Sequence, residues 1–313
     1  VSDVHLGNLS PDAVDELVSD SLRLPLHLTS ELARIVNSKT GGNPLFAVQL
    51  LHSLVDADLL RFSLESRRWE WDAQVINARE LAGNVVDLIA ANMRELPETA
   101  HRVIMAAACF GSQCQESMLR LLGRVRDDSD GLCIIDAPPD TISECINVIT
   151  AAGLIYKVGK ELCVFSHDRI HVAAYSSIPQ TDMWHLHIGR RLRTVLPNET
   201  LCGPAIFIVV DQLDRGLALI PEEDTTTRTD LAELNLIAGQ RALDSSSYVP
   251  ASIYFKRAVK LLGEGDCWEC NYDLTLRIHN CCAQSLSITG NDKDSLHLIL
   301  SSVLTNAKCF EDK

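Results

Sequence analysis

Residues 141–165 read TISECINVITAAGLIYKVGKELCVF, and this stretch decides how the middle of the chain folds. Its first half carries apolar residues at helical spacing, and Gly153 ends the run. Its second half holds two β-prone arms, residues 154–157 and 162–165, on either side of a polar turn. The stretch therefore predicts an amphipathic helix followed by a β-hairpin.

Further helices are predicted on both sides of this stretch. Before it, the apolar spacing predicts helices over residues 84–96, 98–109 and 115–122, and a polar loop over residues 127–140. After it, a helix follows from Asp168 to Ser177. Three helices and then a hairpin is the element order of a winged-helix domain, which we expect over residues 81–200.

The N-terminal 58 residues predict three short helices. Ser10 and Pro11 are typical of a helix start, Gly41 and Gly42 of the end of a helix that begins near Thr29. A third helix starts at Asn43 and Pro44. Such short amphipathic helices need a packing partner. Residues 4–6 are expected to end a strand, and residues 59–64 and 69–71 to pair as a hairpin, within a connector over residues 59–80.

The C-terminal third predicts an antiparallel array of helices. Four segments have helical periodicity, and small residues recur where helices must approach closely, as in tetratricopeptide-like arrays. The four segments are residues 231–245, 249–262, 269–289 and 293–308, and the small residues are Ala238, Ala242, Ala251, Ala258 and Ala283. The expected fold class is mainly α: short helices and a winged-helix domain with small β-hairpins, followed by this array over residues 201–313.

Composition excludes several classes of protein. The 313 residues suggest about two domains of ~150 residues. A net charge of −14 argues against broad electrostatic binding to nucleic acid or anionic membrane. Purely apolar runs, such as residues 205–210, are far short of a membrane span. The 11 cysteines are expected to be reduced thiols in the cytoplasm. Because the chain starts at Val1 rather than Met, we expect a fragment or a trimmed chain.

No nucleotide-binding or catalytic motif is complete. The only Gly-Lys pair, Gly159 and Lys160, is followed by Glu161, so the phosphate-binding P-loop pattern is absent. Residues 206–211 imitate the apolar strand and terminal aspartate of a magnesium-binding element, although an apolar helix is the alternative that we favour. No serine lies in a nucleophile-elbow setting, and we expect no enzymatic activity from this chain alone.

The candidate metal-binding and DNA-binding residues each have a structural interpretation as well. A zinc site is one interpretation of Cys267, Cys270, His279, Cys281 and Cys282, but they fall in one predicted helix or its start, so no metal is expected. His185 and His187 suggest either a ligand pair or a solvated helix face. Residues 141–152 carry no Lys or Arg, which disfavours DNA binding by the expected winged helix and favours a regulatory or packing role.

Two segments are more specific. The first surrounds Gly42, Asn43 and Pro44, where a proline ring at a helix start can pack on a flat ligand beside free helix amides. The second is His167 and Asp168, where an imidazole can donate a hydrogen bond to a phosphate. Helix capping, by Asn43 in the first segment and Asp168 in the second, is the alternative explanation.

Taken together, several segments resemble the AAA ATPase-like module of large multidomain serine/threonine and hybrid histidine kinases, which is a STAND-type signal-transduction ATPase. The resemblance covers nearly the whole chain, and FSHDRIHVAAY is its most specific part. The segments are KTGGNPLF (residues 39–46), WEWD (69–72), AAACFG (106–111), FSHDRIHVAAY (165–175), HIGRRL (187–192) and LNLIAG (234–239).

The resemblance implies that residues 1–58 are the helical lid of such an ATPase, whose P-loop core lies outside this sequence. It implies that Gly42, Asn43 and Pro44 match the family's G-x-P element, whose proline packs near the adenine. His167 and Asp168 match the M-H-D element, whose histidine contacts the bound diphosphate, with Ser166 in place of the methionine.

The sequence thus predicts the regulatory part of a nucleotide-dependent switch. ATP or ADP would be its cofactor only together with the P-loop core, and the parent protein would be an ATPase, possibly fused to a kinase. Residues 201–313 would bind a protein partner. A nucleotide-independent helical scaffold is the first alternative, and a winged-helix DNA-binding regulator is the second.

Overall fold

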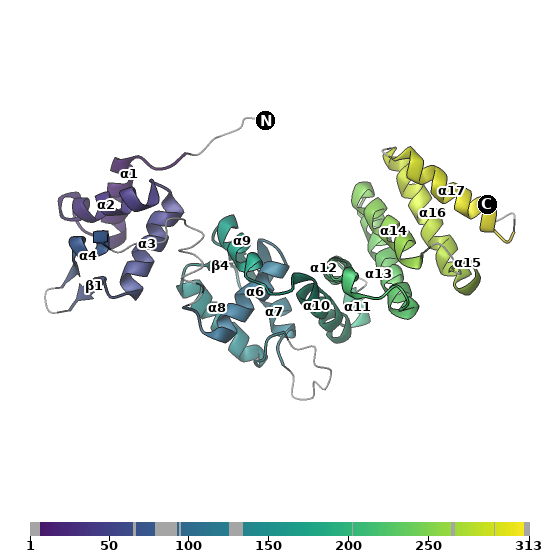
Figure 1. Cartoon of the computed structure of the whole chain (residues 1–313), viewed down its shortest axis with the longest axis horizontal. Helices are drawn as coiled ribbons and strands as arrows, with labels where there is room; N and C mark the ends of the chain where they lie inside the picture. Colours follow the sequence, from purple (N-terminus) through teal and green to yellow (C-terminus); the bar gives the residue numbers. More distant parts are fainter. Residues whose placement is uncertain are drawn as a thin grey trace. The chain divides into compact units, whose positions relative to one another are not determined.

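The computed structural model describes residues 7–64, 67–78, 93, 95–124, 134–201, 203–263, 267–290 and 292–309. The chain folds into two compact units, whose main helices and strands are labelled in Figure 1. The first unit comprises residues 1–123 and 135–178, and the second comprises residues 124–134 and 179–313. Both are mainly helical, as expected, and the first also contains two small antiparallel sheets.

The starts of the first and third helices and the end of the second lie at the predicted residues, whereas the second helix begins at Leu26, three residues before the expected Thr29. In α1 (Pro11–Leu22), the Ser10 hydroxyl accepts a hydrogen bond from the Ala13 amide at 3.2 Å. Helix α2 (Leu26–Thr40) ends at Gly41, whose φ is +60°. In α3 (Pro44–Asp56), the Asn43 side chain accepts from the Phe46 amide at 3.3 Å. Local side-chain chemistry therefore sets these boundaries.

The predicted hairpin forms and joins the core of these helices. Strands β1 (Leu60–Ser63) and β2 (Arg68–Trp71) pair antiparallel, with Leu60 opposite Trp71, and the short helix α4 (Ala73–Ala78) follows. The buried side chains of Leu60 and Ile76 belong to the same hydrophobic cluster as α1, α2 and α3. The segment that we expected to be a separate connector is thus continuous with the first three helices.

In its described residues, the central part of the first unit combines four helices with a three-stranded sheet of order β3-β5-β4. Strand β5 lies in the middle and pairs antiparallel with both neighbours. The sequence did not predict β3. The elements are α6 (Glu98–Cys109), β3 (Gln113–Gln115), α7 (Glu116–Leu121), α8 (Pro139–Ala151), β4 (Ile155–Val158), β5 (Leu162–Phe165) and α9 (Asp168–Ser176).

Three predictions made from the sequence concern residues that fall wholly or in large part outside the described ones. They are the strand end at residues 4–6, the helix over residues 84–96 and the first half of the loop over residues 127–140. The helices that are described precede the hairpin in the expected order. The winged-helix assignment itself stays a prediction.

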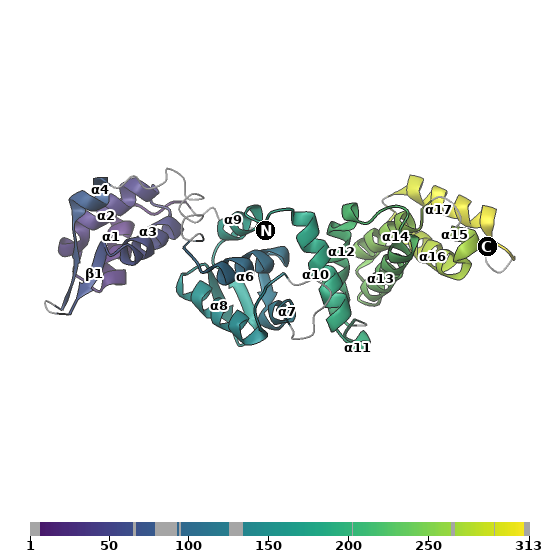
Figure 2. The ribbon, with the colours of Figure 1, turned by 60° about the horizontal axis from the view of Figure 1, so that its bottom comes forward.

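The second unit begins earlier than the expected array. Its first long helix, α10 (Thr181–Val195), packs against α12 (Ala205–Arg215), and the two lie side by side (Figure 2). We had expected the preceding domain to extend to residue 200, whereas the unit boundary lies between Ile178 and Pro179. The elements are α10 (Thr181–Val195), α11 (Asn198–Leu201), α12 (Ala205–Arg215), the 3-10 turn η1 (Leu217–Leu219), α13 (Thr225–Asp244), α14 (Tyr248–Leu262), α15 (Cys267–Cys270), α16 (Tyr272–Thr289) and α17 (Lys293–Asn306).

Successive long helices of the second unit pack on one another: α13 on α14, α14 on α16, and α16 on α17. Short connections between packed helices make neighbours antiparallel. Gly239 on α13 permits the closest approach, because a Cβ there would lie 2.4 Å from the ring of Phe255. Ala238, Ala242, Ala251 and Ala258 are buried, as their predicted role requires, and Ala283 is half-buried. Among the described helices, none is long and apolar enough to cross a membrane.

Candidate functional site

The structure brings the two predicted site segments to neighbouring positions in the first unit. The guanidinium of Arg169, in the first turn of α9, lies over the ring of Phe46, in the first turn of α3, at 5.6 Å from the ring centroid. The Gln49 side-chain amide, one turn further along α3, donates to the Gly153 carbonyl at 3.4 Å. The start of α3 and the start of α9 thus form one candidate site, which we call the α3–α9 site.

Gly42 shapes the backbone that precedes α3. Its φ is +76°, and a Cβ there would lie 2.3 Å from the carbonyl oxygen of Leu9. The Leu9 amide in turn donates to the Gly42 carbonyl at 2.7 Å. Residue 42 therefore has to be glycine for a structural reason, because a side chain would collide with the backbone of the segment before α1.

Asn43 and Pro44 begin α3 in the way that the sequence predicts. The Asn43 side chain caps the helix, and Pro44 occupies the first helical position, where its missing amide costs nothing. The ring of Pro44 is exposed. It therefore offers a rigid apolar surface beside a helix start, where backbone amides and the helix dipole favour negative charge.

His167 caps α9, and this corrects one expectation. The alternative explanation gave the cap to Asp168, whereas His167 Nδ1 accepts from the Arg169 amide at 3.1 Å and Asp168 occupies the first turn. When Nδ1 accepts, the neutral ring carries its proton on Nε2. Because His167 is exposed, this Nε2–H is available as a donor to an external acceptor.

Arg169 is a site residue that the sequence reasoning did not single out. Its side chain is exposed and forms no ion pair with any residue in the described ranges. It contributes a cation to a region that also holds two helix starts and the His167 donor. Its position two residues after His167 was the available signal, since His167 caps α9 and Arg169 lies in the first turn of that helix.

The magnesium-like segment is a helix, as the favoured alternative predicted. Residues 206–211 lie within α12, and the Asp211 carboxylate accepts from the Tyr254 hydroxyl at 3.2 Å. Arg257 lies 3.7 Å from the same carboxylate. Burial raises the pKa of Asp211, and the Tyr254 hydrogen bond and the Arg257 charge oppose that shift. Asp211 is therefore a structural carboxylate that links α12 to α14.

The candidate metal ligands have other roles in the described parts of the chain. Cys267 and Cys270 lie on the short helix α15, and His279 Nδ1 bonds the Thr275 carbonyl at 2.8 Å. Within the described ranges, no three side chains of His, Cys, Asp or Glu lie close enough to hold a metal ion.

His185 does not lie on a solvated helix face, which was one of the two interpretations of His185 and His187. It is buried, and its Nδ1 lies 2.7 Å from the side-chain oxygen of Gln212 on α12. Burial lowers the pKa of His185, and the Gln212 contact acts in the opposite direction. The histidine therefore holds α10 to α12.

Helix α8 lacks the features of a DNA-reading helix. Its exposed positions include Glu144, Asn147 and Val148, and it contains no Lys or Arg. The nearby cation Lys157 is used internally, 2.8 Å from Glu116. Specific DNA binding needs cations directed at phosphates and donors directed at base edges, and α8 supplies no cation.

Comparisons with known proteins give two similarities. No protein-family model matches the chain. The chain is 28% identical, over 97% of its length, to the hybrid signal transduction histidine kinase G of Dictyostelium discoideum, and it spans only 10% of that protein. Among solved structures, it is similar to a STAND (signal transduction ATPase with numerous domains) protein with a tetratricopeptide repeat sensor from Pyrococcus horikoshii. That similarity has a TM-score of 0.48 and 13% identity, and it covers 96% of this chain and 41% of the other. The chain is thus similar in sequence to one segment of a much larger signalling kinase.

Proposed function

We propose that this chain is the regulatory part of a nucleotide-dependent signal-transduction switch. In this proposal a P-loop core outside this sequence holds ADP or ATP, and the α3–α9 site closes on the nucleotide. The helices after Pro179 bind a protein partner and bias the switch. The parent protein would be an ATPase, and its similarity to a hybrid histidine kinase suggests fusion to a kinase.

One observation carries the proposal: the contact between Arg169 and Phe46 joins the starts of α3 and α9. Phe46 and Arg169 are 123 positions apart in the sequence, and nothing in the local pattern of either segment requires them to meet. Together, the starts of α3 and α9 supply an apolar ring from Pro44, a neutral hydrogen-bond donor from His167 and a cation from Arg169. A nucleoside diphosphate has the matching parts, namely a flat base and a charged diphosphate.

The residues of the site would have separate roles toward such a ligand. Pro44 would pack its exposed ring against the base. His167 Nε2–H would donate to a phosphate oxygen, because Nδ1 is already engaged by the Arg169 amide. A contact with His167 that exists with ADP and not with ATP would give the two nucleotides different effects on the switch, as a ligand-driven change requires.

The experiment joins this chain to a matching P-loop core and measures ADP retention. His167→Ala should increase the rate of ADP release about tenfold, the effect expected from losing a hydrogen bond to a charged group. His27→Ala is the matched control, because His27 is an exposed histidine on α2 outside the site. Unchanged ADP release in His167→Ala would remove the phosphate contact from the proposal.

Pro44→Ala tests the base-side contact in the same fusion. Its control is Pro11→Ala, because Pro11 occupies the same first position of α1 that Pro44 occupies in α3. We expect weaker nucleotide binding in Pro44→Ala alone. If both fusions bind nucleotide equally and the helices after Pro179 bind their partner regardless of ATP or ADP, the chain is a nucleotide-independent scaffold.

A further inference from the structure

A cavity of about 790 Å³ lies in the second unit, among α14, α15, α16 and α17. It is distinct from the α3–α9 site, since all of its lining residues lie at or after Lys256. Its volume is within the range of pockets that enclose small organic molecules. The wall residues that decide its chemistry are Val259, Lys260, Trp268, His279, Leu298 and Ile299.

Most of the wall is apolar and is held in place by specific contacts. The Trp268 ring packs against His279, with 4.9 Å between the ring centroids, and its indole N–H donates to the Ser302 hydroxyl at 3.3 Å. Val259 and Ile299 add aliphatic surface from α14 and α17. Leu298, which also lines the cavity, is 72% exposed. The cavity therefore offers an apolar interior whose walls are already positioned.

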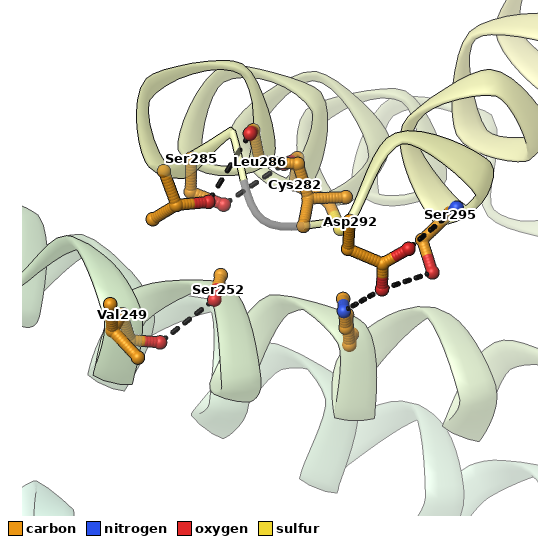
Figure 3. A network of polar contacts seen from close by, with 9 residues as sticks. Val249, Ser252, Cys282, Ser285, Leu286, Asp292 and Ser295 are labelled. Atoms are coloured by element: carbon orange, nitrogen blue, oxygen red, sulfur yellow. Dashed lines mark hydrogen bonds and ion pairs between the residues drawn. The ribbon is translucent and has the colours of Figure 1, made fainter.

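One of the two lysines at the cavity is neutralised within the protein. Lys256 Nζ lies 2.5 Å from the Asp292 carboxylate, which also accepts from the Ser295 hydroxyl at 2.7 Å (Figure 3). These three groups tie α14 to the start of α17. Lys256 therefore has its counter-charge and is a structural residue at the edge of the cavity.

Lys260, one turn further along α14, differs from Lys256. Its side chain is exposed, it lines the cavity, and it forms no ion pair with any residue in the described part of the chain. An ammonium group of this kind attracts an anion at short range.

His279 contributes a neutral polar group. Because its Nδ1 bonds the Thr275 carbonyl, the neutral ring carries its lone pair on Nε2. Burial also lowers the pKa of His279, so that the ring stays uncharged at neutral pH. Lys260 is thus the one uncompensated cation among the described residues that line the cavity.

We propose that this cavity binds a small organic carboxylate with an apolar body. The body would occupy the space between Trp268 and Ile299, and the carboxylate would pair with the Lys260 ammonium. This inference goes beyond the nucleotide switch and does not depend on it, because the cavity is complete within the second unit.

The test is a calorimetric titration of the full 313-residue chain with phenylbutyrate and with its neutral analogue phenylbutanol. We expect phenylbutyrate to bind about tenfold more tightly, because only it forms a charge-assisted contact. Lys260→Met should bring the two affinities to within about twofold of each other. Lys293→Met is the matched control, because Lys293 is an exposed lysine of α17 that does not line the cavity.

A second variant tests whether the ligands bind in this cavity. Val259→Trp should fill the cavity and weaken both ligands at least about tenfold, with the helical circular dichroism signal confirming that the chain is folded. If that variant does not fold, Trp268→Phe replaces it and should abolish a ligand-induced change in tryptophan fluorescence. The proposal is overturned if neither ligand binds, if Lys260→Met leaves the preference for the carboxylate intact, or if Val259→Trp folds and binds normally.

Discussion

The two units of this chain differ in what they bury. In the described residues of the first unit, the buried polar side chains are few and uncharged, namely Thr29, Thr40 and Gln49. The second unit buries more of them, including titratable groups: His185, Arg191, Gln212, Asn235, Ser252, Thr275, His279 and Ser285. His167, Asp168 and Arg169, which have candidate functional roles in the first unit, are by contrast exposed.

This difference separates two uses of polar chemistry. In the second unit the buried groups bond one another or the backbone: Asn235 donates to Asp214 at 3.0 Å, and Ser252 and Ser285 bond carbonyls of their own helices (Figure 3). The Asn235–Asp214 bond joins α13 to α12 and helps to specify that these helices pack together, because an unpaired buried polar group is costly. The two serine bonds satisfy buried hydroxyls within a single helix. In the first unit apolar packing holds the fold, and the side chains of His167 and Arg169 are exposed to solvent.

The largest expected effect is on the core of the second unit. Phe255 is fully buried and packs against Gly239. Phe255→Ala should lower the free energy of unfolding of the second unit by about 3–5 kcal/mol, because it removes a large side chain and leaves a cavity. Hydrogen exchange should show faster exchange in α13 and α14 and unchanged exchange in α2.

Phe62→Ala is the control, because Phe62 is 49% exposed on the hairpin of the first unit. It should change the free energy of unfolding by less than about 1 kcal/mol. Equal acceleration of exchange in both units of Phe255→Ala would show that the units do not unfold separately, and the comparison would fail.

An intermediate effect is expected from charge pairs. Arg257 lies 2.9 Å from the Asp214 carboxylate, which is only 6% exposed, whereas Arg61 and Glu70 of the first unit are 61% and 44% exposed. Arg257→Met should cost about 1–2 kcal/mol, since it strands a buried carboxylate although the arginine itself is partly solvated. Arg61→Met should cost less than about 0.5 kcal/mol.

A double-mutant cycle in urea unfolding sharpens this result. Asp214→Asn in the Arg257→Met background should recover part of the lost stability, because it removes the unpaired charge. If Arg257→Met and Arg61→Met cost the same, burial of the carboxylate has no energetic consequence and the contrast between the units is weaker than proposed.

The smallest effect is the pH dependence of the second unit. Burial lowers the pKa of His185 and of His279 below the ordinary value of 6.5, so the unfolded chain binds protons first as the pH falls. Their contribution to stability is therefore complete above pH 6.5 and is lost progressively below it. Unfolding of the second unit in urea should need less denaturant at about pH 6 than at about pH 7.5.

His185→Gln should reduce this pH dependence, and the exposed His297→Gln should leave it unchanged. Burial also lowers the pKa of His101 in the first unit, so that unit should respond in the same direction but less, with one such group. A first unit that loses more stability than the second over this pH range would contradict the comparison.

Much of the local structure could be predicted because its causes are local. Ser10 caps α1, Gly41 ends α2, and Asn43 caps α3 with a bond to an amide three residues away. The helix and hairpin over residues 141–165 likewise follow from periodicity and a polar turn. The prediction was less good where a short segment depends on a distant partner, since β3 is a strand only through its pairing with β5.

The amino-acid sequence alone determined the mainly helical class, most helix boundaries and the two segments of the α3–α9 site, because caps, glycines and apolar spacing act within a few residues. Only the tertiary structure decided that Arg169 meets Phe46, that His185 is buried against Gln212, and that Lys256 is neutralised while Lys260 is not. Each of these depends on which distant helices pack together. A residue's charge, exposure and partner are properties of that packing, and the sequence around the residue does not contain them.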